Sequence, residues 1–367
     1  MNPLPPQFDH LLTQVLSELG AFQVSTNPDR KVADRDFRVV QPAGSDFHLE
    51  VKEFKRITPA IAESACLTLK RNSDATGAQP ILYASVVSDR TAEIAIRHGV
   101  SWMDFAGNCR LVFPPYGIYV RRSGIDNPFG KQLPKVLNVF SSKSSRVVRA
   151  MLQDPFRGWQ LNELASRPDV QISPGLMSRI KRSLVEGGYA LMLEGQLRLK
   201  RPDDLLDDWV NHYRTHKPRE YGFYMRGELE QVEQQVANWC SKSSSEYALS
   251  RFSAAWRLAP EVRYNVASFM VSTNAILTEP FIDLTTHYGA RKVDSGANLI
   301  LQISDDESYF SNRLGDTLPT TSPLQTYLDL RAMDGRGEDA ATAIYEKYLK
   351  QKFTEATEWA AENHEGN

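Results

Sequence analysis

The chain has 367 residues, of which 41% are hydrophobic and 24% are charged, and its formal net charge is −2. These proportions are ordinary for a globular protein, and the length suits two or three domains rather than one compact unit. The sequence has no membrane-spanning apolar run, no signal-peptide pattern and no paired cysteine spacing. We therefore expect a cytoplasmic protein without a disulfide framework or a zinc site.

Helical and strand patterns alternate in residues 1–135, which we expect to form one α/β domain. The apolar run at 81–87 is typical of a strand that is buried on both faces. The expected elements are a helix that closes at Gly20, strands at 36–40 and 47–52, a helix at 59–69, a strand at 81–87, a helix at 91–98, and strands at 110–113 and 118–120.

Three polar residues of this domain form a pattern with chemical meaning. A hairpin folded about the turn at 42–45 brings Asp36 opposite the end that holds Glu50 and Lys52, which share a face because they are two apart in a strand. Two carboxylates can hold a divalent metal ion, and a lysine can orient a water molecule. The arrangement resembles the PD-(D/E)XK restriction-endonuclease-like fold. That resemblance implies a Mg²⁺-dependent nuclease with Asp36 and Glu50 as metal ligands and Lys52 as the catalytic lysine.

Other interpretations of this pattern remain open. Arg35 stands where the motif usually has a proline, and many domains of this fold serve only as a scaffold or a DNA clamp. An exposed ion pair at a strand end also explains the residues. We favour a scaffold without any cofactor over a nuclease.

The segment 104–108, Asp-Phe-Ala-Gly-Asn, follows a buried strand. We expect a turn in which Asp104 and Asn108 bond to their own backbone. The alternative is a loop that contacts DNA or a partner.

A linker rich in Gly, Pro and Ser precedes a second pattern, at 141–201. A first helix ends at Asp154-Pro155, and a short second helix is expected to include Trp159. A third helix begins after Ser173, a favourable N-cap, and ends at Gly187-Gly188. A hairpin then turns at Glu194-Gly195. This order of elements predicts a central winged helix-turn-helix domain.

Charge supports DNA binding by this segment. Eleven basic and five acidic residues lie between Lys143 and Arg201, a net charge of +6 in a chain whose total is −2. A basic region within an acidic chain is typical of a protein that binds a polyanion. The residues expected on the DNA side of the third helix and the hairpin are Ser173, Ser178, Arg179, Lys181, Arg182, Arg198 and Lys200.

Residues 204–367 are expected to form a third, α/β domain. They contain no Gly-rich phosphate loop, no His/Cys cluster and no serine-elbow motif. Surface position or helix capping explains Asp283, Asp294, Asp329 and Arg336, and we expect the acidic tail after Phe353 to fray. The expected elements are helices at 205–213, 228–240, 248–258 and 281–288, strands at 266–271 and 298–303, and helices at 324–330 and 338–349.

The motifs at 322–330 (SPLQTYLDL) and 335–341 (GRGEDAA) resemble the C-terminal signature of the AbiEi-like antitoxins of type IV toxin–antitoxin systems. The segment 293–298, the turn at 104–108 and the winged-helix pattern fit the same family. The resemblance implies a bacterial regulator that binds operator DNA, encoded beside a nucleotidyltransferase-like toxin that it counteracts. Family members often lack a nuclease-like first domain, so the sequence does not decide whether the regulated locus encodes a toxin, a phage-defence system or something else.

The sequence thus predicts a regulator that binds double-stranded DNA and represses its own operon or a toxin or phage-defence locus. A homodimer is compatible with this prediction. No membrane partner is expected. The alternative is a metal-dependent nuclease that the winged helix delivers to DNA. A protein-interaction subunit of a defence complex is a third possibility.

Overall fold

The computed structural model describes residues 7–26, 35–55, 57–129, 137–272, 281–333 and 335–364, except for the side chains of Arg35, Asp36, Ser142 and His364. The chain divides into two compact units. The first is Met1–Val136 with Glu186–Gly188, and the second is Leu137–Val185 with Tyr189–Asn367. None of the helices in the described ranges is long and apolar enough to cross a membrane.

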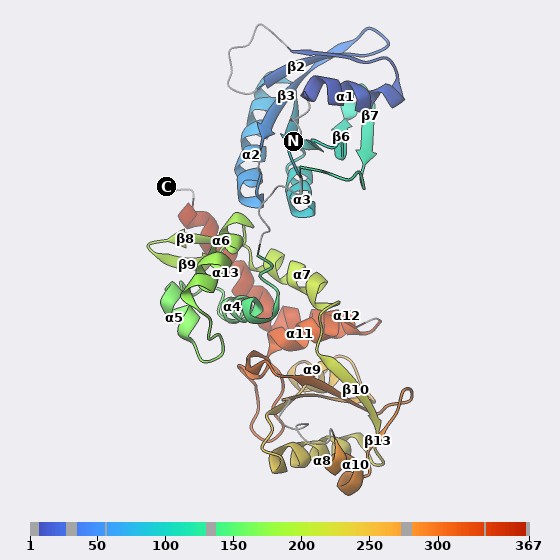
Figure 1. The fold of residues 1–367 in the computed structure, drawn as a ribbon, viewed down its shortest axis with the longest axis vertical. Helices are drawn as coiled ribbons and strands as arrows, with labels where there is room; N and C mark the ends of the chain where they lie inside the picture. Colours follow the sequence, from blue (N-terminus) through green and yellow to red (C-terminus); the bar gives the residue numbers. More distant parts are fainter. Residues whose placement is uncertain are drawn as a thin grey trace. The chain divides into compact units, whose positions relative to one another are not determined.

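The first unit is built on a seven-stranded sheet whose strands lie side by side in chain order (Figure 1). The neighbours β3–β4 and β4–β5 are parallel, and the other neighbouring pairs are antiparallel. The strands are β1 (Gln23–Thr26), β2 (Arg35–Val40), β3 (Asp46–Phe54), β4 (Gln79–Ala84), β5 (Ser101–Asp104), β6 (Cys109–Phe113) and β7 (Ile118–Arg122).

Helices cover both faces of this sheet. On one face α1 (Phe8–Leu16) buries Phe8 and Leu12 against Phe37 and Tyr83, and a short 3₁₀ turn, η1 (Ser17–Leu19), follows it. On the other face, α2 (Pro59–Thr76) and α3 (Asp89–Arg97) pack over alternate residues of β4. Another 3₁₀ turn, η2 (Pro114–Tyr116), joins β6 to β7. The apolar run in β4 is therefore buried on both sides, as its sequence predicts.

The second unit begins with three helices and a hairpin, which we call the helix–hairpin segment (residues 141–201). Its elements are α4 (Ser142–Gln153), α5 (Leu161–Ser166), α6 (Pro174–Glu186), β8 (Ala190–Leu193) and β9 (Gln196–Leu199). The Ser173 hydroxyl accepts a hydrogen bond from the Leu176 amide at 3.3 Å, as expected of the N-cap of α6. Glu194 and Gly195 both have positive φ, which suits the two-residue turn between β8 and β9.

A five-stranded sheet in the order β11-β12-β14-β10-β13 follows. Only β12 and β14 pair in parallel. The strands are β10 (Arg219–Tyr224), β11 (Tyr247–Leu249), β12 (Ala267–Ser272), β13 (Arg291–Lys292) and β14 (Leu299–Ser304). The helices are α7 (Pro202–Tyr213), α8 (Leu229–Lys242), α9 (Arg251–Leu258), α10 (Ile282–Tyr288), the 3₁₀ turn η5 (Glu307–Phe310), α11 (Pro323–Arg331), α12 (Gly337–Ile344), the π-helical turn η6 (Tyr345–Leu349) and α13 (Lys350–His364).

One continuous hydrophobic core runs through the whole second unit. It contains Val148 of α4 and Leu184 of α6, and also Phe269 of β12 and Leu328 of α11. Trp209, on α7, contributes to the same core and is 2% exposed. The helix–hairpin segment is therefore packed onto the C-terminal sheet and helices rather than standing apart from them.

The chain after Phe353 does not fray as the sequence predicts. It forms α13, whose residues Phe353, Ala356 and Ala360 are all buried. These three positions are spaced i, i+3 and i+7, which places them along one helical face. The expectation of a loose tail was wrong for residues 354–364, because two alanines complete the buried stripe and alanine gives a weak apolar signal.

Three further differences are smaller. The strands β1, β10 and β13 were not predicted, and the expected helix at 248–258 is divided into β11 and α9. Trp159 does not lie in a helix. Its backbone pairs with Leu197 of the hairpin through two hydrogen bonds of 2.9 Å.

We expect Phe353→Ala to lower the free energy of unfolding by about 3–5 kcal/mol, because it removes a fully buried ring from the core. The measurement is urea unfolding of the full-length chain followed by tryptophan fluorescence. The neighbouring exposed position gives a matched control, and Lys352→Ala should change the stability by less than about 0.5 kcal/mol. Equal stabilities for the two variants would show that α13 is not part of the folded core.

Candidate nucleic-acid interface

The helix α6 has one buried and one exposed face. Met177, Ile180 and Leu184 point into the core and are each at most 1% exposed. Ser173, Ser178, Arg179 and Arg182 are exposed, and Lys181 is half-buried. Within the described part of the chain, neither Arg179 nor Arg182 makes a hydrogen bond or an ion pair. Their guanidinium groups can therefore meet an external anion without breaking an internal contact.

Most of the other arginines in the helix–hairpin segment are held internally. Arg167 donates from two nitrogens to the two carboxylate oxygens of Asp169, each at 2.9 Å. Arg157 pairs with Glu163, and both Arg157 and Arg167 lie over the ring of Trp159, at 4.1 and 5.2 Å from its centroid. The positive charge that the sequence places in this segment is thus only partly available to a ligand.

Two more arginines attach the segment to its surroundings. Arg146 lies 3.0 Å from Asp306, and Arg201 lies 3.5 Å from Asp204. A third, Arg149 on α4, is 2% exposed and lies between the rings of Trp209 and Tyr309, at 5.1 and 4.9 Å from their centroids. A count of charges along the sequence cannot separate such residues from the exposed arginines of α6.

The hairpin alternates as its sequence predicts. Leu197 and Leu199 are buried, whereas Arg198 and Lys200 point the other way and are half-buried. Lys200 has an interaction within the protein. The guanidinium of Arg198 lies 4.4 Å from the ring centroid of Trp359 on α13, so the hairpin is not open to solvent along its whole exposed edge.

A buried polar network holds α7 against α11. The Tyr213 hydroxyl donates to Asp329 Oδ1 at 2.7 Å, and the Gln325 amide donates to both groups at 2.9 Å. Gln302 of β14 adds a longer bond of 3.4 Å to the same carboxylate oxygen. Asp329 is 2% exposed, so the interpretation of Asp329 as a surface or capping residue was wrong. Its partners lie up to 116 residues away in sequence, which local patterns cannot reveal.

In the first unit, Asp36 and Glu50 are direct cross-strand partners on β2 and β3. Glu50 is 5% exposed and accepts a hydrogen bond of 2.7 Å from Asn72 of α2, while Lys52 is half-buried on the same face of β3. No three His, Cys, Asp or Glu side chains lie together as possible metal ligands among those that the structure describes. The side chain of Asp36 lies outside the described residues, so the predicted metal and catalytic roles remain predictions.

The turn at 104–108 forms as expected for Asp104, whereas the Asn108 side chain bonds to Asp104 and to the backbone of Ile125 rather than to the backbone of the turn. Asp104 accepts hydrogen bonds from the Ala106 and Asn108 amides, both at 2.9 Å, and Asn108 donates from its own side chain to Asp104 at 2.9 Å. Asn127 donates to Asp104 as well, at 2.8 Å, and to the Ser85 carbonyl at 2.8 Å. The segment therefore serves to close the ends of β4 and β5.

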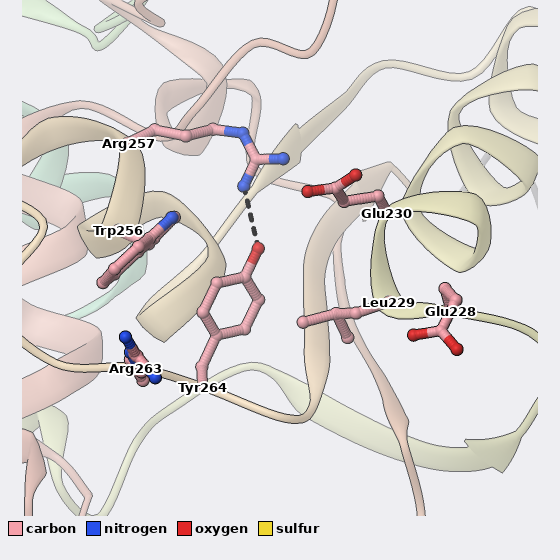
Figure 2. Close-up of a pocket in the computed structure, with 7 residues that line it drawn as sticks. All are labelled: Glu228, Leu229, Glu230, Trp256, Arg257, Arg263 and Tyr264. Carbon is pink, nitrogen blue, oxygen red and sulfur yellow. Dashed lines mark hydrogen bonds between the residues drawn. The ribbon is translucent and has the colours of Figure 1, made fainter.

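At least two cavities lie among the described residues of the second unit. Figure 2 shows the first, of about 610 Å³, where Arg257 donates to the Tyr264 hydroxyl at 3.0 Å. Arg257 is also bonded at 2.5 Å to Glu233, which is fully buried, so this cation is already neutralised. The exposed Arg263 faces Glu228 and Glu230 across the same cavity, and this mixture of charges favours no particular ligand.

The second cavity, of about 690 Å³, adjoins α4, α7 and β14. The rings of His212 and His216 stack there at 4.1 Å, and burial lowers the pKa of His212. The cavity is lined by two cations, Lys217 and Arg219, and by two carboxylates, Asp305 and Asp306. This cavity therefore also lacks a dominant charge.

Comparison with known proteins finds a family that matches part of the chain. Residues 198–350 match the family described as the AbiEi antitoxin, a transcriptional regulator of a type IV toxin–antitoxin system. Over this segment the chain is similar to an AbiEi-family transcriptional regulator. The match covers less than half of the chain, and it excludes α6, α13 beyond Lys350 and the whole first unit. A search of curated proteins and a search of solved structures both find no match.

The match supports the resemblance that the motifs at 322–330 and 335–341 suggest. Both motifs lie inside the matched residues, on α11 and at the start of α12. Asp329 belongs to the first motif, so the buried network of α7 and α11 lies within the AbiEi-like part of the chain.

Stability should become less dependent on pH in the variant Asp329→Asn. Burial raises the pKa of Asp329, so the folded state binds this proton more tightly than the unfolded state does. Its contribution is therefore lost as the pH rises above about 4, the pKa of an exposed aspartate. Urea unfolding of both proteins between pH 4 and pH 8 should show that the wild type loses stability relative to the variant. A difference that is constant with pH would contradict this assignment.

Proposed function

We propose that the protein is a DNA-binding transcriptional regulator of the AbiEi antitoxin type. The helix–hairpin segment acts as a winged helix-turn-helix, and the protein represses its own operon or a toxin or phage-defence locus. Its partners are double-stranded operator DNA and a nucleotidyltransferase-like toxin encoded nearby. The observation that carries this proposal is the pair of exposed, internally uncommitted arginines on α6, together with the family match.

In this proposal α6 enters the major groove by its N-terminal half. Ser173, Ser178 and Arg179 lie in the first turns, and Arg182 lies one turn further along. Arginine can bond to guanine in a bidentate way, so Arg179 and Arg182 are the base-reading candidates. Lys181 and Lys200 are the candidates for phosphate contact, and Arg198 becomes a third only when its contact with Trp359 is broken. A homodimer would place two α6 helices on a two-fold symmetric operator.

A second candidate function rests on the first unit. The cross-strand pairing of Asp36 with Glu50, and the helix α2 between the parallel strands β3 and β4, are features of a PD-(D/E)XK domain. In that case Asp36 and Glu50 would hold Mg²⁺, and Lys52 would assist the attacking water. We favour a scaffold role, because the helix–hairpin segment accounts for DNA binding without catalysis.

The double variant Arg179→Ala/Arg182→Ala should weaken binding to the DNA upstream of the gene. The expected loss is about 1–3 kcal/mol for each arginine that contacts a base. Gel shifts at one fixed salt concentration measure it. The control variant Arg263→Ala/Lys352→Ala removes the same charge from exposed positions elsewhere in the second unit and should bind like the wild type. Equal affinities for both double variants would refute the role of α6.

The nuclease alternative has a separate test. We expect the purified protein with Mg²⁺ or Mn²⁺ to leave plasmid DNA intact, and Lys52→Ala to bind DNA like the wild type. The nuclease would be established by metal-dependent cleavage that is lost in both Glu50→Ala and Lys52→Ala. Thermal unfolding of each variant would verify that the first unit remains folded.

A further inference from the structure

The helix α13 lies against β9 of the hairpin in the helix–hairpin segment (Figure 1). The contact centres on Trp359, which is half-buried. The guanidinium of Arg198 lies over the Trp359 ring, 4.4 Å from its centroid. The ring of Phe156 meets the same indole edge-on, with 6.0 Å between the centroids. A tryptophan face is the strongest aromatic partner for an arginine.

Two nitrogens of the Arg198 guanidinium also donate hydrogen bonds within the protein. Nη1 donates to the Phe156 carbonyl at 3.1 Å, and Nη2 donates to Gln196 Oε1 at 2.8 Å. Gly158 makes room for this arrangement, because a Cβ atom there would lie 2.6 Å from Arg198 Cζ and 2.1 Å from Gln196 Oε1. The position of Arg198 is therefore fixed by its surroundings, which are Trp359, Phe156, Gln196 and Gly158.

We propose that α13 competes with DNA for the hairpin, and that Trp359 is a positioning residue that withholds Arg198 from the phosphate backbone. The proposal rests on the proposed DNA binding. In this position the flat face of the Arg198 guanidinium packs on Trp359, and two of its nitrogens donate hydrogen bonds within the protein. A phosphate can capture it only after those contacts are broken.

The outer face of α13 favours the same outcome. Glu355, Glu358 and Glu362 are exposed and spaced i, i+3 and i+7, so they line one side of the helix. This row of negative charge belongs to the helix that contacts the hairpin, and it opposes the approach of phosphates. Displacement of α13 thus removes these carboxylates from the hairpin and frees one cation.

The contact between Arg198 and Trp359 crosses the boundary of the residues that match the family. Arg198 is its first residue, whereas Trp359 lies beyond its last residue, Lys350. The contact therefore joins the AbiEi-like segment to a helix outside it. We infer that α13 sets the strength of DNA binding in this protein.

Salt titration of DNA binding tests the proposal in the full-length chain. The probe is the duplex upstream of the gene, and the measured quantity is the slope of log K against log salt concentration between 50 and 200 mM. Trp359→Ala should release Arg198 and steepen the slope by about 0.9, the value for one added phosphate contact. The affinity of the variant relative to the wild type should then increase about 3.5-fold when the salt falls from 200 to 50 mM.

Gly158→Ala reaches the same arginine without touching α13. The atoms nearest to the added methyl group belong to the flexible side chains of Arg198 and Gln196, so it should expel the guanidinium at little cost to the fold and steepen the slope equally. Arg198→Ala should leave the wild-type slope unchanged, because the arginine held on Trp359 makes no phosphate contact. Combined with Trp359→Ala, it should cancel the gain.

Two controls separate release of Arg198 from general damage. Trp359→Phe keeps an aromatic face and should retain the wild-type slope. Trp256→Ala removes an exposed tryptophan on α9 (Figure 2) and should also leave the slope unchanged. The proposal is overturned if Trp359→Ala and Gly158→Ala keep the wild-type slope, or if Arg198→Ala alone makes the slope shallower. An absence of DNA binding by the wild type would instead refute the proposed function itself.

Discussion

The hydrogen bond between Tyr213 and Asp329 is the contact on which the arrangement of the second unit depends. Asp329 has almost no solvent access, and a buried carboxyl is tolerated only when neighbouring donors replace water. Tyr213, Gln325 and Gln302 supply them from three separate elements. Since α7 follows the hairpin directly, the position of α7 on α11 also fixes the position of the helix–hairpin segment. The orientation of α6 is thus set by a polar network within the AbiEi-like region.

The arginines of the helix–hairpin segment serve two different purposes. Arg146, Arg157 and Arg167 are paired with acids, and Arg149 is sealed between two aromatic rings. These residues stabilise the scaffold and add little to the field that a DNA phosphate meets. The exposed arginines of α6 are therefore a small fraction of the basic residues. Such a distribution favours binding in which base contacts, rather than bulk charge, contribute a large part of the affinity.

Periodic apolar patterns predicted most of the helices and strands. The helices α4, α6 and α7 and the strand β4 all carry strong stripes or runs of large apolar residues, and each lies within a few residues of its expected bounds. The helix α13 was missed because its buried stripe consists of one phenylalanine and two alanines among glutamates. The strand β10 was missed because Arg219, Glu220 and Gly222 interrupt its apolar alternation.

Contacts between side chains that are distant in sequence were much harder to predict than secondary structure. The sequence identified Arg179, Arg182 and Arg198 alike as cations available to DNA, since all three lie on polar faces of their elements. Their environments differ because the partner of Arg198 is Trp359, which lies 161 positions further along the chain. The buried role of Asp329 escaped prediction for the same reason.

A helix that packs on the hairpin has a consequence for how binding can be adjusted. The buried stripe of α13 runs from Phe353 through Ala356 to Ala360, and only Phe353 buries a large side chain; Trp359, next to Ala360 near the end, is half-buried. The end of a helix opens at a lower free-energy cost than its anchored part. Fraying of the last turns exposes only Ala360 of the buried stripe, so it can free Arg198 while Phe353 and Ala356 stay in the core. Local opening of α13, and not unfolding of the second unit, is accordingly the motion that would couple this helix to DNA affinity.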